Sequence, residues 1–468
     1  MNQGYQSNPK LDDNIFKAYD IRGIVDKNLT TDVAYAIGRA FGSETRALGL
    51  KAVTVARDGR LSGPKLIDAL SQGLRDSGCD VINIGRVPTP VLYFSTHFLE
   101  TGTGIMVTGS HNPPEYNGLK MMLNGITLSG ETIQRLKQRI RAQDFSIGDG
   151  ALREEDITQA YLDRITGDIE LARPLRIAVD CGNGVAGELA PELYRRLGCE
   201  VTELFCEING HFPNHHPDPS QPETLETLIK EVTGSQGKAY DLGLAFDGDG
   251  DRLGVVSPDG EIIWPDRQMI LYAQDILSRL PGAEIVYDIK CSRNLEQAII
   301  DAGGKATMWM TGHSLVKAKL KESGAPLAGE MSGHIFFKER WLGFDDALYT
   351  GARLLEILAK DDRPTREIFN RLPDMVNTPE LRLEMNEGEH HEFMVKLKEV
   401  ARFDGARVTT IDGLRVDFDS GWGLVRASNT TPCLVIRFEG ENEREMFEVQ
   451  DVFRKLFLKL DPNLRLPF

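Results

Sequence analysis

The sequence predicts an α/β protein in which three related α/β domains precede a smaller C-terminal α+β domain. With 468 residues, the chain exceeds the size at which one hydrophobic core keeps growing. Its first three quarters alternate short β-branched runs with amphipathic helical stretches, a pattern typical of α/β layers. The last hundred residues instead show short strands separated by turns, with helices before and after, which indicates a different kind of domain.

The first domain shows the alternation most clearly. We expect a helix capped by Thr31, because Val33, Ile37 and Phe41 share one of its faces. The further expected elements are strands at 53–56, 81–84 and 104–107 and a helix with Leu66, Leu70 and Leu74 on one stripe.

A unit of one strand and a polar turn recurs along the chain at spacings of a little over a hundred residues, at 53–59, 176–184 and 284–290. We interpret this echo as three related domains. The fourth domain is expected to carry strands at 381–385, 408–411, 414–418 and 434–438. The predicted domains are 1–155, 156–261, 262–373 and 374–468.

Composition excludes several classes of protein. There are 54 basic and 70 acidic residues, a formal charge of −16, which argues against nucleic acid and anionic membrane as partners. No run of eighteen apolar residues occurs, and the first residues do not resemble a signal peptide, so we expect a cytosolic protein. The six cysteines lack CxxC spacing and are expected to be reduced, mostly buried thiols.

A serine-containing loop, Thr108-Gly109-Ser110-His111-Asn112-Pro113-Pro114, follows the predicted strand 104–107. The glycine permits close approach to a ligand and the prolines stiffen the exit, so Ser110 would be displayed at a strand end, where α/β sheets place their sites. An ordinary Pro-rich turn is the alternative. A Ser-His hydrolase is disfavoured because the GxSxG elbow is missing.

An acidic motif, Asp247-Gly248-Asp249-Gly250-Asp251-Arg252, follows the apolar run 242–246. Carboxylates at alternate positions point the same way on an extended backbone and form a hard oxygen site suited to magnesium. An EF-hand would need Gly at its sixth position and Glu at its twelfth, where Arg252 and Pro258 stand. An acidic turn without metal remains the alternative.

The two motifs together set a charge requirement. Three aspartates, one divalent cation and a phosphorylated serine sum to about −3. Cations must therefore lie close by, and Arg252, Arg22 and Lys120 are the candidates.

Weaker signals come from three further loops. Residues 426–432 combine an arginine with hydroxyl and amide groups, as a phosphate cradle would, although Ser-Asn-Thr-Thr is also ordinary turn chemistry. In the loop 329–334, Glu330 and Ser332 could bind hydroxyl groups and His334 could move a proton. The segment 311–317 is similar in kind. The histidines 211, 215 and 216 suggest zinc, but the surrounding prolines and the absence of a cysteine partner argue against it.

Together these motifs resemble the α-D-phosphohexomutase family, and within it the bacterial phosphomannomutase/phosphoglucomutase branch. The likeness runs from Phe16-Lys17-Ala18-Tyr19-Asp20-Ile21-Arg22-Gly23 to the loop at 426–432. It implies four domains around a central active-site cleft, each contributing one loop. It also implies Mg2+ as the cofactor and a reversible transfer of a phosphoryl group between the 6- and 1-positions of mannose or glucose phosphates.

By the same likeness, Ser110 is a phosphoserine that ligates the metal together with Asp247, Asp249 and Asp251. The loop at 330–334 corresponds to the sugar-reading loop. It reads GEMSGH with Gly329, whereas phosphoglucosamine mutases typically carry GEQSGH. The residues that would hold the non-transferring phosphate are Arg426, Ser428, Asn429 and Thr430. The positions that would line the cleft are Tyr19, Arg22, His111, Lys120, Lys290, His313 and His334.

The expected reaction passes through a hexose 1,6-bisphosphate that turns end for end and also serves as activator. Magnesium and Arg252 would bear the phosphoryl charge, while Arg22, Lys120 or His334 would manage the sugar proton. Because the substrate is an anion, a local group of cations must outweigh the net charge of −16. The alternatives are a phosphatase in which water attacks phosphorylated Ser110, and an inactive sugar-phosphate binding protein. We expect a monomer, with a weak dimer as the alternative.

Overall fold

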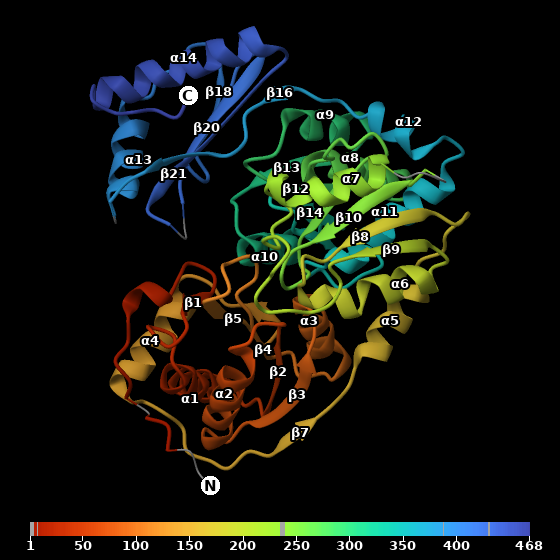
Figure 1. The fold of residues 1–468 in the computed structure, drawn as a ribbon. Coiled ribbons are helices and arrows are strands. Elements are labelled where there is room, and N and C mark those ends of the chain that lie inside the picture. Colours follow the sequence, from red (N-terminus) through yellow and green to blue (C-terminus); the bar gives the residue numbers. More distant parts are fainter. Residues whose placement is uncertain (1–3, 7, 235–238, 387, 429–430) are drawn as a thin grey trace.

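The computed structural model describes residues 4–6, 8–234, 239–386, 388–428 and 431–468. Figure 1 shows three α/β units, coloured red to orange, yellow to green and green to teal, and a fourth unit in blue. Among the described helices, none is long and apolar enough to span a membrane.

The first unit is a mixed sheet in the order β1-β5-β4-β2-β3-β7, with β6 beside β5. Its strands are β1 (Ile21–Ile24), β2 (Ala52–Arg57), β3 (Asp80–Arg86), β4 (Gly104–Val107), β5 (Tyr116–Leu123), β6 (Ile126–Thr127) and β7 (Leu152–Glu154). Its helices are the 3-10 turn η1 (Asp13–Ile15), α1 (Thr31–Ala47), α2 (Gly63–Asp76), α3 (Thr89–Phe98) and α4 (Glu131–Ala142). Residues of α1, α2 and α4 form one hydrophobic core, and α3 belongs to another.

The second and third units each contain a four-stranded sheet. The second comprises α5 (Thr158–Thr166), β8 (Arg176–Asp180), η2 (Val185–Glu188), α6 (Ala190–Arg196), β9 (Glu200–Leu204), η3 (Pro222–Leu225), α7 (Glu226–Gly234), β10 (Leu242–Phe246) and β11 (Leu253–Val256). The third comprises α8 (Pro265–Arg279), β12 (Glu284–Asp288), α9 (Arg293–Asp301), β13 (Lys305–Trp309), α10 (His313–Ser323), β14 (Leu327–Gly329), β15 (Ile335–Phe337), α11 (Ala347–Lys360) and α12 (Thr365–Asn370).

The last unit is an antiparallel sheet with two helices. It comprises β16 (Val376–Asn377), β17 (Leu381–Glu384), α13 (Glu389–Val400), β18 (Arg407–Thr409), β19 (Leu414–Asp417), β20 (Gly421–Ala427), β21 (Cys433–Gly440) and α14 (Glu443–Leu460). The predicted α+β class of this region is confirmed.

One strand order is repeated in the first three sheets: β3-β2-β4-β5, β9-β8-β10-β11 and β13-β12-β14-β15. In each, two parallel pairings are followed by one antiparallel pairing. The echo in the sequence corresponds to β2, β8 and β12, which occupy the same place in the three sheets. The prediction of three related α/β domains is therefore confirmed.

This repetition positions three loops equivalently. The loops 108–115, 247–252 and 330–334 each join the parallel strand to the antiparallel strand that follows it. In the fourth motif, the described residues 426–428 and 431–432 lie at the end of β20 and directly before β21. The serine motif, the acidic motif and the motifs at 329–334 and 426–432 thus all stand where one strand is followed by the next.

The hydrophobic cores connect the four units unequally. One cluster of buried residues continues from α3 through the second unit into the third. Within it, Phe94 meets Tyr161 at 5.5 Å between ring centroids, and Trp341 stacks on Tyr349 at 4.2 Å. The fourth unit has its own core and joins the third through a small cluster of Ile289, Trp422 and Leu424. The first three units therefore share a core that the fourth does not.

Two local predictions are wrong. Thr30, and not Thr31, caps α1, because the Thr30 hydroxyl accepts a hydrogen bond from the Val33 amide at 3.2 Å. The strand predicted at 408–411 is displaced to Arg407–Thr409, where it pairs with Leu414–Asp417 across a turn centred on Asp412 and Gly413.

We predict that Gly38→Ala destabilises the first unit. A Cβ atom on Gly38 would lie 2.3 Å from the Leu70 carbonyl oxygen, so α1 and α2 could not keep their spacing. The expected loss is about 1–3 kcal/mol, measured as a lower thermal midpoint. The control is Gly234→Ala at the end of α7, where a Cβ meets nothing within 4 Å. That change should be neutral or stabilising by up to about 1 kcal/mol. Equal losses in both variants would contradict the packing argument.

Candidate active site

Ser110 lies on the loop between β4 and β5, buried and in the left-handed backbone region with φ of 49°. A non-glycine residue there is strained and needs support from its surroundings. Its hydroxyl donates to Asp247 Oδ2 at 3.0 Å and lies 3.2 Å from His111 Nδ1. The serine loop of the first unit and the acidic loop of the second therefore meet at the Ser110 oxygen.

Arg60 supports the serine loop through hydrogen bonds to its backbone. Its guanidinium donates to four backbone carbonyls, at 2.7 Å to Ser110 and 2.5 Å to Asn112, and also to those of Pro113 and Tyr116. Asp58 completes the support, since it accepts from the Thr108 hydroxyl at 2.8 Å and the Gly109 amide at 3.1 Å. Arg60 is 1% exposed. The buried Arg60 guanidinium thus supplies hydrogen bonds to the carbonyls of a loop that is not paired with a neighbouring strand.

The acidic loop is a tight turn between β10 and β11. The Asp251 and Arg252 amides both donate to Asp247 Oδ1, at 3.1 and 3.2 Å. The three carboxylates converge because the chain wraps around Asp247, and not because the backbone is extended, which was the geometry considered from the sequence. Gly248 is pressed against the serine loop, where a Cβ would lie 2.4 Å from the Ser110 carbonyl oxygen.

The three aspartates fit a metal ion. Asp247, Asp249 and Asp251 are fully buried, and one oxygen of each lies within 4.8 Å of the others. Asp249 Oδ1 has no hydrogen-bond partner among the described residues, and Asp251 Oδ1 has only the His334 ring, at 3.3 Å. Buried carboxylate oxygens without partners are costly, and an oxygen-rich set of this kind is what hard divalent cations prefer.

Three cationic groups surround the aspartates. Lys120 Nζ lies 2.8 Å from Asp249 Oδ2 and also bonds Asp251, and Arg252 Nε lies 4.0 Å from Asp247 Oδ2. Burial disfavours charge on Lys120, but Asp249 and Asp251 outweigh burial and raise its pKa. These are two of the candidates named from the sequence. The third, Arg22, instead bonds Asp20 and Asn112, both at 2.5 Å.

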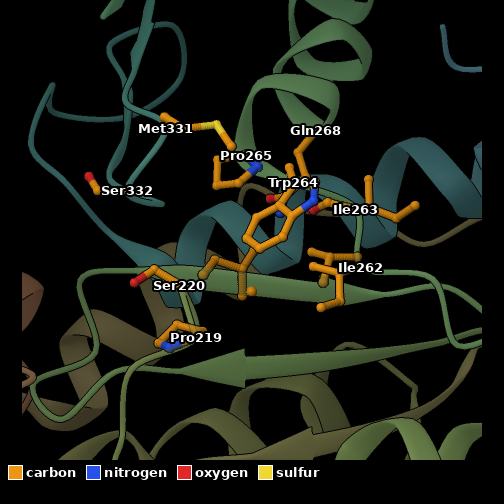
Figure 2. Close-up of a pocket in the computed structure, with 12 residues that line it drawn as sticks. Pro219, Ser220, Ile262, Ile263, Trp264, Pro265, Gln268, Met331 and Ser332 are labelled. Atoms are coloured by element: carbon orange, nitrogen blue, oxygen red, sulfur yellow. The ribbon is translucent and has the colours of Figure 1, made fainter. Parts of the chain in front are cut away.

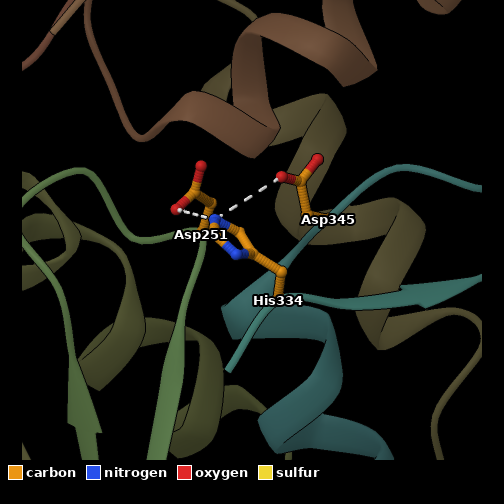
Figure 3. Close-up of side chains that lie close together, drawn as sticks. All are labelled: Asp251, His334 and Asp345. Atoms are coloured by element: carbon orange, nitrogen blue, oxygen red, sulfur yellow. Dashed lines mark ion pairs between the residues drawn. The ribbon is translucent and has the colours of Figure 1, made fainter. Parts of the chain in front are cut away.

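His334, and not Arg22, is the third cationic group beside the aspartates. Figure 3 shows its ring between Asp251 and Asp345. Its Nε2 lies 3.3 Å from Asp251 and 3.9 Å from Asp345, and its Nδ1 lies 3.1 Å from Glu330. Burial alone would lower its pKa, but Asp251 and Glu330 outweigh burial and raise the pKa to about 9. His334 is therefore protonated at neutral pH.

Glu330 and Ser332 belong to one hydrogen-bonded loop with His334. Glu330 Oε1 accepts from the Gly312 amide at 2.6 Å, and Oε2 accepts from the Ser332 hydroxyl at 3.1 Å. The Ser332 oxygen also lies 2.9 Å from His334 Nδ1. The loop is thus braced internally and against the start of α10.

A small cavity of about 10 Å³ lies behind this loop. Figure 2 shows Met331 directed toward Pro265, with Trp264 at the centre of the lining and Ser332 at one side. The space holds about one water molecule and is too small for a sugar.

His313 lies at the start of α10 and belongs to the same group of side chains. Its ring stacks on His334 at 5.7 Å between centroids, and Tyr19 approaches it edge-on at 6.0 Å. Burial, followed by the charges of Lys317 and Lys120, lowers the pKa of His313 well below its usual value. His111 is similar, since burial and Arg252 lower its pKa. At neutral pH, His313 and His111 are therefore neutral, whereas His334 is protonated.

The loops of the third and fourth units meet around Lys290 and Arg426. Lys290 Nζ bonds Glu380 at 2.6 Å, and Arg426 Nε bonds Asp412 at 3.0 Å. Arg426 is buried, and its second terminal nitrogen (Nη2) has no hydrogen-bond partner among the described residues. The Ser428 hydroxyl lies 3.0 Å from the Thr431 hydroxyl. Asn429 and Thr430 lie outside the described residues.

The segment 211–216 contacts the first unit through Phe212, whereas His215 bonds within the second unit. His215 Nε2 lies 3.0 Å from Asp180, and its Nδ1 lies 2.9 Å from the His216 carbonyl. In the same segment Phe212 lies under the Arg60 guanidinium, 5.1 Å from ring centroid to Cζ.

Sequence reasoning missed four residues of this site: Asp58, Arg60, Thr89 and Asp345. Thr89 donates to Asp249 at 2.5 Å, and Asp345 bonds Lys317 at 2.7 Å. Asp58 was visible as the polar end of the first echo strand, equivalent to Asp180 and Asp288. The others carry no local signal, because their partners are 28 to 160 residues away in the chain.

The comparisons with known proteins agree with this architecture. Four family models match consecutively: domains I, II and III of phosphoglucomutase/phosphomannomutase, described as alpha/beta/alpha, at 13–147, 159–260 and 264–376, and its C-terminal domain at 380–456. The chain is therefore a member of the phosphoglucomutase/phosphomannomutase family, and the resemblance inferred from its motifs is confirmed.

Individual relatives are similar over nearly their full length. A phosphomannomutase/phosphoglucomutase of Pseudomonas aeruginosa is 52% identical over 460 residues, covering 98% of this chain and 99% of its own. A phosphoglucomutase of Neisseria gonorrhoeae is 52% identical over 457 residues, covering 97% and 98%. The crystal structure of a phosphoglucomutase/phosphomannomutase family protein from Burkholderia thailandensis superposes with a TM-score of 0.93 at 54% identity, covering 98% of this chain and all of that one.

We predict that a divalent cation stabilises the protein through the acidic loop. With Mg2+ or Mn2+ at about a hundredfold excess over Kd, the unfolding free energy should rise by about 2.7 kcal/mol, read as a higher thermal midpoint. Asp249→Asn should remove most of this rise, because it removes a charged ligand. Asp259→Asn, on the exposed turn after β11, is the control and should keep it. If the cation raised the thermal midpoint equally in Asp249→Asn and Asp259→Asn, the ion would bind outside the acidic loop.

Proposed function

We propose that this chain is a phosphomannomutase/phosphoglucomutase that interconverts hexose 6-phosphates and hexose 1-phosphates through a phosphoserine at Ser110. The observation that carries the proposal is the 3.0 Å contact between the Ser110 hydroxyl and Asp247, one of three converging aspartates. Family membership supports it, as do the names of the relatives at 52% identity.

Charge balance favours a phosphoserine at this position. The three aspartates carry about −3 when ionised, and Lys120, Arg252 and protonated His334 carry about +3. A divalent cation and a phosphoserine of about −2 then add a second balanced pair. These charges sum to about zero, so the positive charge that attracts an anionic substrate against the −16 of the whole chain has to come from further cations, for which Arg22, Lys290 and Arg426 are the candidates.

Magnesium is the proposed metal, held by Asp247, Asp249, Asp251 and a phosphoryl oxygen on Ser110. When bound, such an ion neutralises phosphoryl charge as a Lewis acid. The chain's own residues do the rest. Arg252 and Lys120 offset charge on the transferring group, and the serine loop fixes the line of attack.

Lys120, Arg22 and His334 are the proposed groups for the sugar proton. His334 and Lys120 are both protonated before the transfer, and Lys120 is closest to the aspartates. We therefore propose that His334 or Lys120 gives its proton to the departing Ser110 oxygen and takes the proton that the sugar hydroxyl loses, while Arg22 orients the substrate.

We place sugar recognition at Glu330 and Ser332, with Tyr19, His111, Lys290 and His313 lining the same cleft. The non-transferring phosphate would be held by Arg426, Ser428, Asn429 and Thr430. The buried Arg426 nitrogen without a described partner supports this assignment. A hexose 1,6-bisphosphate would turn between the two transfers and would also reload Ser110. A cytosolic location and a monomeric state remain predictions.

The function is tested with Ser110→Ala. We expect the variant to fold, to lose mutase turnover by a factor of about 10⁴ or more, and to bind hexose phosphates with unchanged affinity. The wild type should isomerise sugar without releasing phosphate, whereas a phosphatase would release one phosphate per turnover. Undiminished mutase activity in Ser110→Ala would contradict the proposal.

The two sugars should be used with similar efficiency. Glu330 and Ser332 are proposed to bind the 3- and 4-hydroxyls, which form a similar pair after the intermediate turns, so carbon 2 is not read. Mannose and glucose differ only at carbon 2. The kcat/KM values for mannose 1-phosphate and glucose 1-phosphate should agree within about tenfold. A difference of several orders of magnitude would show that carbon 2 is recognised.

Arg60→Lys should lower kcat without raising KM. A lysine cannot reproduce the fork to four carbonyls, so Ser110 would be displaced while the sugar and phosphate loops are untouched. A misplacement of about 1 Å at the reacting atom costs on the order of a hundredfold. Arg46→Lys, whose guanidinium bonds only the exposed Leu50 carbonyl, is the control. Loss of stability in Arg60→Lys with kcat unchanged would reduce Arg60 to a purely structural role.

A further inference from the structure

Cys181 and Cys206 bring their sulfur atoms to 3.7 Å of each other in the second unit. Cys181 follows β8 and Cys206 lies two residues beyond β9, the parallel neighbour in which Leu204 stands opposite Asp180. The Cys181 amide extends this pairing by donating to the Leu204 carbonyl at 3.1 Å. Adjacent strands keep their backbones at about the separation that a disulfide spans.

The two thiols differ in their surroundings. Cys206 is partly exposed, whereas Cys181 is completely buried. Burial, followed by the hydrogen bond from Cys206, raises the pKa of Cys181 well above its usual value. The remaining cysteines (Cys79, Cys199, Cys291 and Cys433) are buried, and in the described part of the chain no other two sulfur atoms lie in contact.

We propose that Cys181 and Cys206 form a reversible disulfide when the protein meets a peroxide. The Cys206 thiolate attacks one peroxide oxygen, the O–O bond breaks, and a sulfenic acid and hydroxide result. The Cys181 thiol then displaces the hydroxyl group of that sulfenic acid, so the S–S bond forms and water leaves. A dithiol reductant then reduces this bond by thiol–disulfide exchange. Both protein thiols are regenerated, and the reductant becomes a disulfide.

Formation of this bond is expected to shift the segment that follows Cys181, which is hydrogen-bonded to the acidic loop. The sulfur atoms must approach to about 2.05 Å, a movement of about 1.6 Å. The adjoining backbone has little slack, because Asn183 and Phe205 are both left-handed, with φ of 62° and 50°, and are bonded to each other at 2.8 Å. Next along the chain, the Val185 amide donates to the Gly248 carbonyl at 3.2 Å.

Gly248 stands between two of the three converging aspartates and against the Ser110 carbonyl. Displacement of the segment that follows Cys181 therefore reaches the reacting centre. A shift of about 1 Å there can cost on the order of a hundredfold, so we expect oxidation to lower mutase turnover by about ten- to a hundredfold. The disulfide itself does not depend on the proposed function, although this effect on turnover does.

The test uses the reduced full-length protein treated with hydrogen peroxide and then with an alkylating agent. We expect the intact mass to fall by two hydrogen atoms before alkylation, four of the six thiols to be alkylated in denaturant, and a crosslinked tryptic peptide to contain both cysteines. Without the disulfide, Cys181 and Cys206 fall on separate tryptic peptides, because trypsin cleaves after Arg195 and Arg196, which lie between them. Mutase turnover should fall in parallel and return with dithiothreitol.

Two variants make the test specific. Cys206→Ser should keep its turnover under peroxide and yield no crosslinked peptide. Cys199→Ala, a buried cysteine of the same unit with no sulfur neighbour in the described structure, should behave as the wild type. Six intact thiols after peroxide would overturn the disulfide. Equal inactivation of Cys206→Ser, or full activity of the crosslinked protein, would overturn its effect on turnover. If the reduced protein had no mutase activity, the thiol count and the peptide map would still decide the disulfide.

Discussion

The contact between the serine loop and the acidic loop is the interaction on which the site depends. Ser110 Oγ donates to Asp247 at 3.0 Å, and Gly248 lies directly against the Ser110 carbonyl. Three buried carboxylates are thereby concentrated beside one hydroxyl, a repulsive arrangement that is tolerable only with cations around it. Lys120 and His334 supply them from the first and third units. The electrostatic requirement of one loop is thus met by side chains from three units.

The repeated fold supplies the geometry that makes this convergence possible. Each of the first three sheets ends in a turn from a parallel to an antiparallel strand, and that turn carries the functional residues. A shared hydrophobic core holds these three units together, whereas the fourth contacts the third through a small cluster around Trp422 and through polar contacts such as those of Arg415 with the Ile289 and Cys291 carbonyls. The proposed phosphate-binding residue Arg426 therefore lies on the unit outside the shared core, and closure of the cleft on a substrate would require this unit to rotate.

Much of this could be predicted from the sequence. The strand echo identified β2, β8 and β12 because period-2 hydrophobic runs and polar turns are local signals. The acidic motif was found from its spacing, although its convergence comes from a tight turn around Asp247. Arg60 and Asp345 could not be found, since their roles arise from partners distant in the chain. The charge of His334 likewise follows from its burial between Asp251 and Glu330, which no local pattern reports.

The measurement that tests the central claim most directly is the intact mass of the purified protein, followed by mapping of its phosphopeptides. The account predicts a species heavier by one phosphate, located on Ser110, and loss of that phosphate to hexose 1,6-bisphosphate when excess hexose monophosphate is added as the phosphoryl acceptor. Protein without covalent phosphate even after incubation with hexose 1,6-bisphosphate, or phosphate on any residue other than Ser110, would contradict it.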